Sequence, residues 1–180
     1  MMTSTIKKNS ALVLEQGMTF SYDPIFVASK NNISFEDSSS VLYLSGGTLH
    51  ATVTGMLLTR GTLLVERVST LRVEFRENQD TFETISGGLV LGNNNSNDDF
   101  TCQILNSAVL DFTNGDLIYK NVNTSSWQMA NYDSVLKLQA FTRLFLEQNI
   151  STIPGRVLIA PTTSIVENGG IFSGSVEIVL

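Results

Sequence analysis

The sequence predicts an all-β protein built as an antiparallel two-sheet β-sandwich. Short runs of β-branched, aromatic and aliphatic residues recur along the chain, and clusters of Gly, Asn, Asp and Ser separate them. Several runs also alternate apolar and polar residues. In the stretch from Thr48 to Gly55, Leu49, Ala51 and Val53 share one face. This period is typical of an antiparallel strand with one buried face.

Applied along the whole chain, these signals predict strands from the N-terminal quarter to the last residue. In chain order the expected strands are Ala11–Leu14, Met18–Tyr22, Ile25–Ala28, Asn32–Phe35, Val41–Leu44, Thr48–Gly55, Thr62–Val68, Leu71–Phe75, Thr84–Leu91, Phe100–Leu105, Ala108–Phe112, Asp116–Tyr119, Ser134–Ala140, Arg143–Glu147, Arg156–Ile159 and Ser173–Leu180. About eight to ten main strands in two sheets is the range of a jelly roll. We expect an extended N-terminal segment at residues 1–21, as an attachment arm, and one sandwich domain at residues 22–180.

Two turns carry the strongest local predictions. Asn114-Gly115 lies between two apolar runs and predicts a hairpin, because both central residues of the favoured turn need positive φ. The segment Ser134–Asn149 has no Gly or Pro and fits two readings. One is a helix, and the other is two strands joined by a tight turn near Phe141-Thr142, which the many preceding strands favour.

The composition restricts the classes of function. The chain has 180 residues, of which 42% are hydrophobic and only 16% are charged, with a net charge of −6. A surface poor in charge suggests that a partner covers part of it, and an acidic balance argues against nucleic-acid binding. No apolar run is long enough for a signal peptide core or a membrane span. We therefore expect a complete protein that folds in the host cytoplasm and contacts neither nucleic acid nor membrane.

Three pieces of the C-terminal part, in order, resemble the trimeric jelly rolls of the tumour-necrosis-factor and complement-globular-head superfamily, including their bacterial and phage versions. They are "VLDFTNGDLIYK", "SVLKLQAFTRLFL" and "IFSGSVEIVL". The turn Ala140-Phe141-Thr142 departs from the family's usual Ala-Gly-Asp. The resemblance implies a homotrimer in which the closing strand runs through the middle of the inner sheet, paired on both sides. The oligomer core that it implies consists of Phe172, Val176, Ile178 and Leu180.

The sequence contains weak candidates for chemistry but no catalytic motif. His50 is the only histidine, and it lies on the Thr-rich face of a strand, so we interpret it as a surface residue. Asp98 and Asp99, in an Asn-rich loop, could supply oxygen ligands to calcium, although such loops are more often plain connections. Trp127 and Tyr132 lie in one loop and are candidates for contact with a partner or ligand. We expect no enzymatic activity, no cofactor and no firm metal site.

These observations favour a structural protein of a virus or phage particle, such as a capsid decoration, head-fibre or minor capsid component. Its expected partners are other copies of itself and other particle proteins. A bacterial surface or spore-coat trimer of the same fold is one alternative, but the collagen-like stalk and secretion signal usual there are absent. A carbohydrate-binding sandwich is the second, for which Trp127 and Tyr132 are the only aromatic support. We also expect deletion of Ser175–Leu180 to abolish folding, since the resemblance buries that strand.

Overall fold

The computed structural model of the chain describes residues 4–22, 33–51, 56–73, 76–77, 84–85, 88–92, 99–120 and 127–179. These residues form β-strands, turns and loops, and no helix is found among them. Within this part of the chain there is accordingly no helix of the length and apolarity needed to span a membrane. The expected strand Ile25–Ala28 lies outside the described residues.

Most strands belong to three parallel sheets. Sheet 1 contains β2 (Ala11–Glu15), β5 (Val41–Ser45), β8 (Gly61–Glu66), β13 (Phe100–Ile104) and β16 (Trp127–Met129). Sheet 2 contains β3 (Thr19–Tyr22), β6 (Thr48–Ala51), β9 (Val68–Val73), β14 (Val109–Thr113), β17 (Val135–Leu138), β19 (Ile150–Ile159) and β21 (Phe172–Ile178). Sheet 3 contains β7 (Met56–Leu58), β12 (Gly88–Leu91), β15 (Gly115–Tyr119), β18 (Thr142–Leu146) and β20 (Ser164–Glu167). The first of the small sheets pairs β1 (Ser4–Ile6) with β4 (Ile33–Phe35) in parallel, and the second pairs β10 (Arg76–Glu77) with β11 (Thr84–Ile85) antiparallel.

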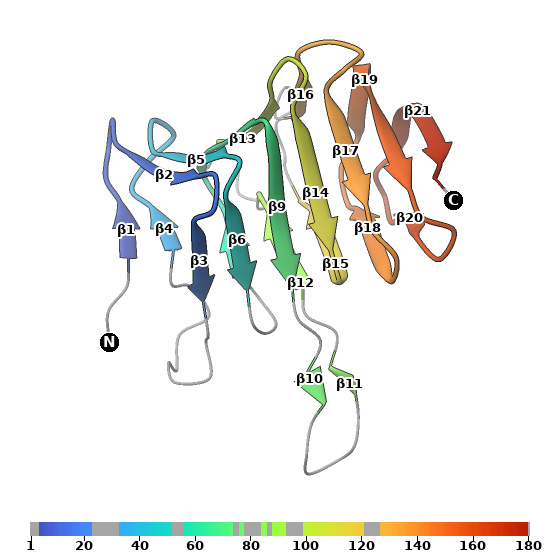
Figure 1. Cartoon of the computed structure of the whole chain (residues 1–180), viewed down its shortest axis with the longest axis horizontal. Coiled ribbons are helices and arrows are strands. Elements are labelled where there is room, and N and C mark those ends of the chain that lie inside the picture. Colours follow the sequence, from blue (N-terminus) through green and yellow to red (C-terminus); the bar gives the residue numbers. More distant parts are fainter. Residues whose placement is uncertain are drawn as a thin grey trace.

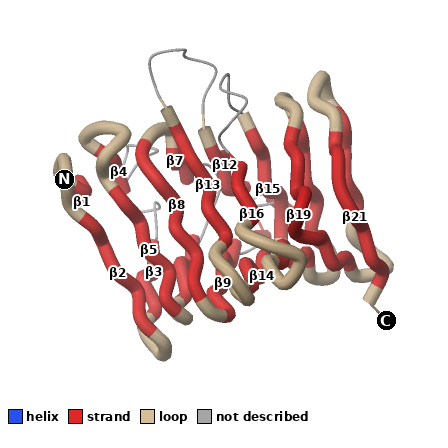
Figure 2. The backbone as a smooth tube through the Cα atoms, turned by 90° about the horizontal axis from the view of Figure 1, so that it is seen from above, coloured by secondary structure: helices blue, strands red, loops and turns tan. Residues whose placement is uncertain are grey.

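The chain winds as a solenoid. It runs through the sheets in a repeated order, for example from β12 in sheet 3 to β13 in sheet 1 and β14 in sheet 2. Each strand then pairs in parallel with a strand of the next coil, as β14 does with β17. Figure 1 shows the strands of successive coils side by side along the long axis, from the N-terminal to the C-terminal end, and Figure 2 shows the same stack from above. Seven strands in sheet 2 correspond to seven coils.

The prediction of an antiparallel two-sheet sandwich is therefore wrong, although the prediction of an all-β chain is confirmed. All pairings within the three large sheets are parallel, as for Leu117 with Leu144. The error has a physical source. A solenoid coil turns one face of each parallel strand to the core and the other to solvent, so its strands alternate apolar and polar residues as a half-buried antiparallel strand does.

Apolar side chains stack in register along the interior. On sheet 2 one such ladder runs from Phe20 through Leu49, Leu71, Phe112, Leu138 and Ile159 to Ile178. Its central members are almost completely buried, as Leu71 and Phe112 are. Each side chain of the ladder covers its counterpart in the preceding coil, so the side chains become more exposed only toward the two ends of the ladder. The fold thus has one continuous core along its axis.

Several residues with positive φ lie at the corners between sheets. Asn114 and Gly115 have φ of 58° and 95°, as the local pattern predicted. They do not form a hairpin, however, because β14 and β15 lie in different sheets and pair with β17 and β18 instead. Phe141, with φ of 61°, makes the corresponding corner one coil later. The segment Ser134–Asn149 therefore contains two strands with a turn at Phe141, and those strands pair with other coils rather than with each other.

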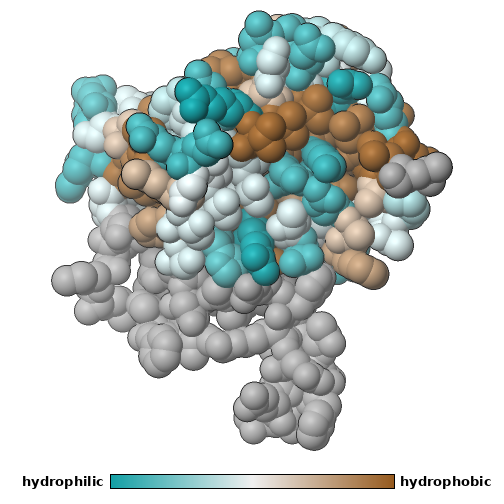
Figure 3. Space-filling model, in the orientation of Figure 1, coloured by the Kyte–Doolittle hydropathy of each residue, from teal (hydrophilic) through white to brown (hydrophobic). Residues whose placement is uncertain are grey.

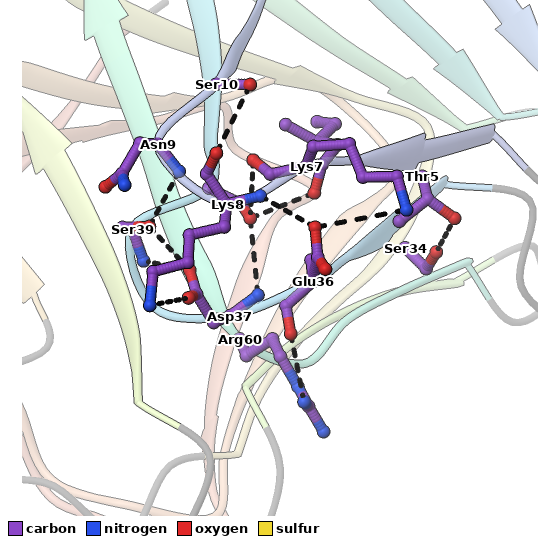
Figure 4. A network of polar contacts seen from close by, with 12 residues as sticks. Thr5, Lys7, Lys8, Asn9, Ser10, Ser34, Glu36, Asp37, Ser39 and Arg60 are labelled. Carbon is purple, nitrogen blue, oxygen red and sulfur yellow. Dashed lines mark hydrogen bonds and ion pairs between the residues drawn. The ribbon is translucent and has the colours of Figure 1, made fainter.

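Hydroxyl groups and ion pairs tie neighbouring corners together. Figure 4 shows the corner of the first two coils, where Lys8, Asp37 and Ser39 lie close together. Near them, buried Ser40 donates its hydroxyl to the carbonyl of Ile6 at 2.9 Å. Lys8 lies 3.6 Å from Asp37, and the backbone N–H of Asn9 donates to Ser39 Oγ at 2.8 Å. Buried Ser134 makes the contact equivalent to that of Ser40 between two later coils, because its hydroxyl donates to the carbonyl of Leu105 at 2.9 Å. Such contacts supply partners for backbone groups that leave the strand ladders at each corner.

Candidate functional site

The C-terminal coil carries the most distinctive surface among the described residues. β21 is the edge strand of sheet 2, because within the part of the chain that the structure describes it pairs only with β19. The expectation that the closing strand lies in the middle of a sheet with partners on both sides is wrong. Val176 and Ile178 stack on Val157 and Ile159, yet they are 41% and 67% exposed, since no further coil among the described residues covers them. Phe172 packs partly buried against the core.

A cluster of polar and aromatic side chains flanks this edge. The guanidinium of Arg156 lies over the ring of Tyr132, 5.0 Å from its centroid. Arg156 also donates to Glu177 Oε2 at 3.3 Å, and the Tyr132 hydroxyl donates to Glu177 Oε1 at 3.3 Å. The only charged side chain of β21 is thus engaged on its own molecule. A cation over an aromatic face and a charge-assisted hydrogen bond reinforce each other here.

The two aromatic candidates from the loop before β17 have separate environments. Trp127 is only 7% exposed, and its ring meets the ring of Tyr119 edge-on at 5.8 Å within the core. Tyr132, at 58% exposure, lies on the outer surface with Arg156. The sequence placed both in one loop, but Trp127 opens strand β16, whose alternation turns it inward. Only Tyr132 of this pair is therefore available to a partner or ligand.

The remaining candidates do not come together. Asp98 lies outside the described residues, and Asp99 is exposed just before β13, with its backbone carbonyl accepting from the N–H of Gly61 at 2.9 Å. His50 is half-buried, and its Nδ1 lies 3.4 Å from Ser21 Oγ. Among the described residues, no group of three or more His, Cys, Asp or Glu side chains has a metal-binding arrangement. Leu180, the fourth residue expected in the oligomer core, is also outside the described part.

Sheet 3 presents an apolar row on its outer side that the sequence analysis did not single out. The row consists of four half-buried side chains on four neighbouring strands, each paired in register with the next: Val90, Ile118, Phe145 and Val166. Ion pairs border the row: Arg143 donates twice to Asp116, at 2.7 and 2.8 Å. On its other side, Lys120 and Glu147 lie 2.9 Å apart. Register between coils creates this row, so no local pattern could have revealed it.

Two cavities of similar size lie near opposite ends of the solenoid. One, of about 320 Å³, is lined by the first coils, including Ile6, Leu12 and Phe20. The other, of about 310 Å³, lies where β17 and β19 end, with Leu158 and Val179 in its wall. Both linings are mainly apolar and include one lysine each. Neither brings together an acid, a base and a nucleophile.

A hydrogen-bonded carboxylate links neighbouring coils on sheet 1. Tyr43 donates its hydroxyl proton to Glu66 Oε2 at 2.5 Å, and Ser45 donates to the same oxygen at 2.8 Å. The bond from Tyr43, followed by that from Ser45, lowers the pKa of Glu66 below its ordinary value of 4.5. The same contact, with burial second, raises the pKa of Tyr43 above 10.0.

This contact predicts a pH-dependent effect of Tyr43→Phe. The folded-state pKa of Glu66 is lowered, so its stabilising contribution is present above pH 4.5 and is lost as the pH falls through the folded pKa. Melting curves should therefore show Tyr43→Phe less stable than wild type at neutral pH, with the gap narrowing below pH 4.5. When Glu66→Gln is present in both proteins, the difference in stability caused by Tyr43→Phe should stay the same as the pH is lowered. A gap that widens on acidification would contradict the assignment.

Cys102 lies in the core and is fully buried, and burial raises the pKa of its thiol. Because the thiolate is the reactive form, we expect wild type to react with an aromatic disulfide reagent only after unfolding in denaturant. Ser175→Cys on the exposed edge strand supplies the control, with one fast-reacting thiol in the folded protein. Rapid labelling of folded wild type would show that β13 is not in the core.

Comparison with protein-family models, with curated proteins and with solved structures finds no match to this chain. The parallel solenoid and its surfaces therefore carry the functional argument.

Proposed function

We propose that this chain is a structural, non-catalytic component of a virus or bacteriophage particle, where it acts by holding its shape and presenting its faces to neighbouring proteins. The observation that carries the proposal is the interior ladder, which continues from coil to coil along sheet 2 through Leu49, Leu71, Phe112 and Leu138. A core of this kind stabilises each coil against its neighbours and keeps the whole stack in one shape.

The outer contacts support the same role. Arg143 and Asp116 belong to successive coils, as do Lys120 and Glu147, so these ion pairs join coil to coil. Their carboxylates thus act as structural partners of basic side chains. The low share of charged residues, 16%, suits a protein whose surface is partly covered in an assembly. A net charge of −6 favours protein neighbours on the particle over its nucleic acid.

The role expected for the N-terminal segment stays a prediction. Residues of this segment form β1 and β2, which pair with β4 and β5 as part of the first coil. Deletion of residues 1–17 would remove β2 and expose the buried side chains of Leu42 and Leu44. A loss of attachment to the particle after this deletion could therefore result from impaired folding. The expected homotrimer rested on the resemblance to jelly rolls, and the chain does not adopt that fold.

Quantitative mass spectrometry of purified particles tests the proposal. Particles from the organism that makes this chain would be separated on a density gradient, and the ratio of the chain to the main shell protein would be measured across the particle peak. We expect a constant ratio through the peak and antibody labelling at the particle surface by electron microscopy. A chain that stays in the soluble fraction, with none in the particle peak, would rule the role out.

A further inference from the structure

The free edge of β21 lacks two of the features by which exposed edge strands usually avoid pairing, namely basic side chains and proline. Its sequence, Phe-Ser-Gly-Ser-Val-Glu-Ile, contains no Lys, Arg or Pro. The opposite end differs, because Lys7 and Lys8 stand at the corner of the first coil. An edge strand without these features is open to pairing with another strand, and the one charged side chain of β21, Glu177, is already paired with Arg156. Figure 3 shows apolar surface reaching the end of the molecule at which the C-terminal coil lies.

The backbone of β21 offers hydrogen-bonding groups toward that free side. The N–H of Val179 donates to the carbonyl of Ile159, and the carbonyl of Ile171 accepts from the N–H of Ile150. Odd-numbered residues therefore point their backbone groups toward β19. Successive residues of a strand alternate in this direction, so Val176 and Ile178 point theirs outward, where an antiparallel partner would meet them.

The side chains of β21 match a second copy of the same strand. If two copies pair antiparallel about Val176, Val176 lies opposite Val176 of the other copy. Ile178 then lies opposite Gly174, which leaves room for it, and Glu177 lies opposite Ser175. No two carboxylates oppose each other, and Glu177 is already neutralised by Arg156. In this arrangement the outward-pointing N–H and C=O groups of Val176 face those of Val176 in the other copy. Such mutually facing groups form the hydrogen-bonded pairs of an antiparallel ladder.

We propose that two copies of this chain associate end to end by antiparallel pairing of their β21 strands about Val176. The pairing joins the two copies of sheet 2 into one sheet and covers the exposed ends of the interior ladders at Val176 and Ile178. Burial of apolar surface and completion of backbone hydrogen bonds both favour it. This inference does not depend on the proposed role in a particle.

Solution mass tests the association. Light scattering of the full chain at micromolar concentration should give twice the monomer mass of 19.7 kDa. Ile178→Lys places a charge on the paired edge and should give the monomer mass with an unchanged melting curve of the monomer fold. Val13→Lys, on an exposed side chain of β2 at the other end, should leave the dimer intact. A monomer at all concentrations, a mass of three chains, or loss of the dimer in Val13→Lys would overturn the proposal.

Cross-linking tests the register. Hydrogen-bonded antiparallel pairs have Cα atoms about 5.5 Å apart and Cβ atoms near the upper end of about 4.5–5.5 Å, which is beyond the Cβ separation of a relaxed disulfide but within reach of a short bismaleimide. A short bismaleimide should therefore join two copies of Val176→Cys into a covalent dimer that persists in denaturant. Ser173→Cys, three residues from the axis, should give none, and buried Cys102 does not interfere. Cross-linking through Ser173→Cys but not Val176→Cys would overturn the pairing about Val176.

Discussion

Phe112→Ala is expected to produce the largest loss of stability of any change considered for this chain. Phe112 is fully buried in the centre of the interior ladder, between Leu71 and Leu138. Replacement of a buried Phe by Ala costs about 3–5 kcal/mol, because it removes apolar contact and leaves a cavity. That is a large part of the stability of about 5–15 kcal/mol that a domain of this size has. Urea unfolding followed by the fluorescence of buried Trp127 would measure the loss.

Phe141→Ala is the matched control for this prediction. Phe141 is 69% exposed at a corner of the same chain, and its positive φ constrains Ala as much as Phe. We expect a change within about 0.5 kcal/mol, as is usual for surface substitutions. If Phe141→Ala destabilised the protein more than Phe112→Ala, the interior and exterior of this part of the coil would have been interchanged.

Gly47→Ala is expected to have the second large effect. A Cβ at Gly47 would lie 2.5 Å from the backbone oxygen of Leu14 and 2.7 Å from its carbonyl carbon. Those atoms belong to the backbone of the first coil, so the methyl group can be accommodated only if the first coil moves away from the second. Overpacking of this kind costs about 1–3 kcal/mol or more. A lower melting temperature, with faster hydrogen exchange in β2, would be the observed result.

Gly88→Ala separates this steric effect from a general effect of replacing glycine. A Cβ at Gly88 would lie 3.6 Å from the backbone oxygen of Asp116, which is ordinary van der Waals contact. Since the substitution also reduces the freedom of the unfolded chain, we expect neutral to slightly higher stability, by about 0.4–1 kcal/mol. Equal destabilisation by Gly47→Ala and Gly88→Ala would show that close contact between the first two coils is not the cause.

The candidate surface at the C-terminal coil could be predicted only in part. Val176 and Ile178 were expected in an oligomer contact, and the structure leaves them exposed at an edge, where such a contact stays open to test. Their expected burial inside a sheet was wrong, and so the expectation that deletion of Ser175–Leu180 abolishes folding loses its basis. Tyr132 was found from its aromatic character, but its partners Arg156 and Glu177 come from later coils. No pattern within a few residues could have joined these three.

The sequence by itself determined the local structure of this protein. Alternation of apolar and polar residues predicted strands that the structure contains at Val41–Ser45, Phe100–Ile104 and Gly115–Tyr119, and the Asn114-Gly115 pair predicted two positive φ angles. Only the tertiary structure decided which strands pair and in which direction. Leu71 meets Phe112 and Leu144 meets Leu117 through contacts between separate coils. A half-buried strand has the same alternating pattern in a parallel solenoid as in an antiparallel sandwich, so the direction of pairing depends on distant residues that stack in register.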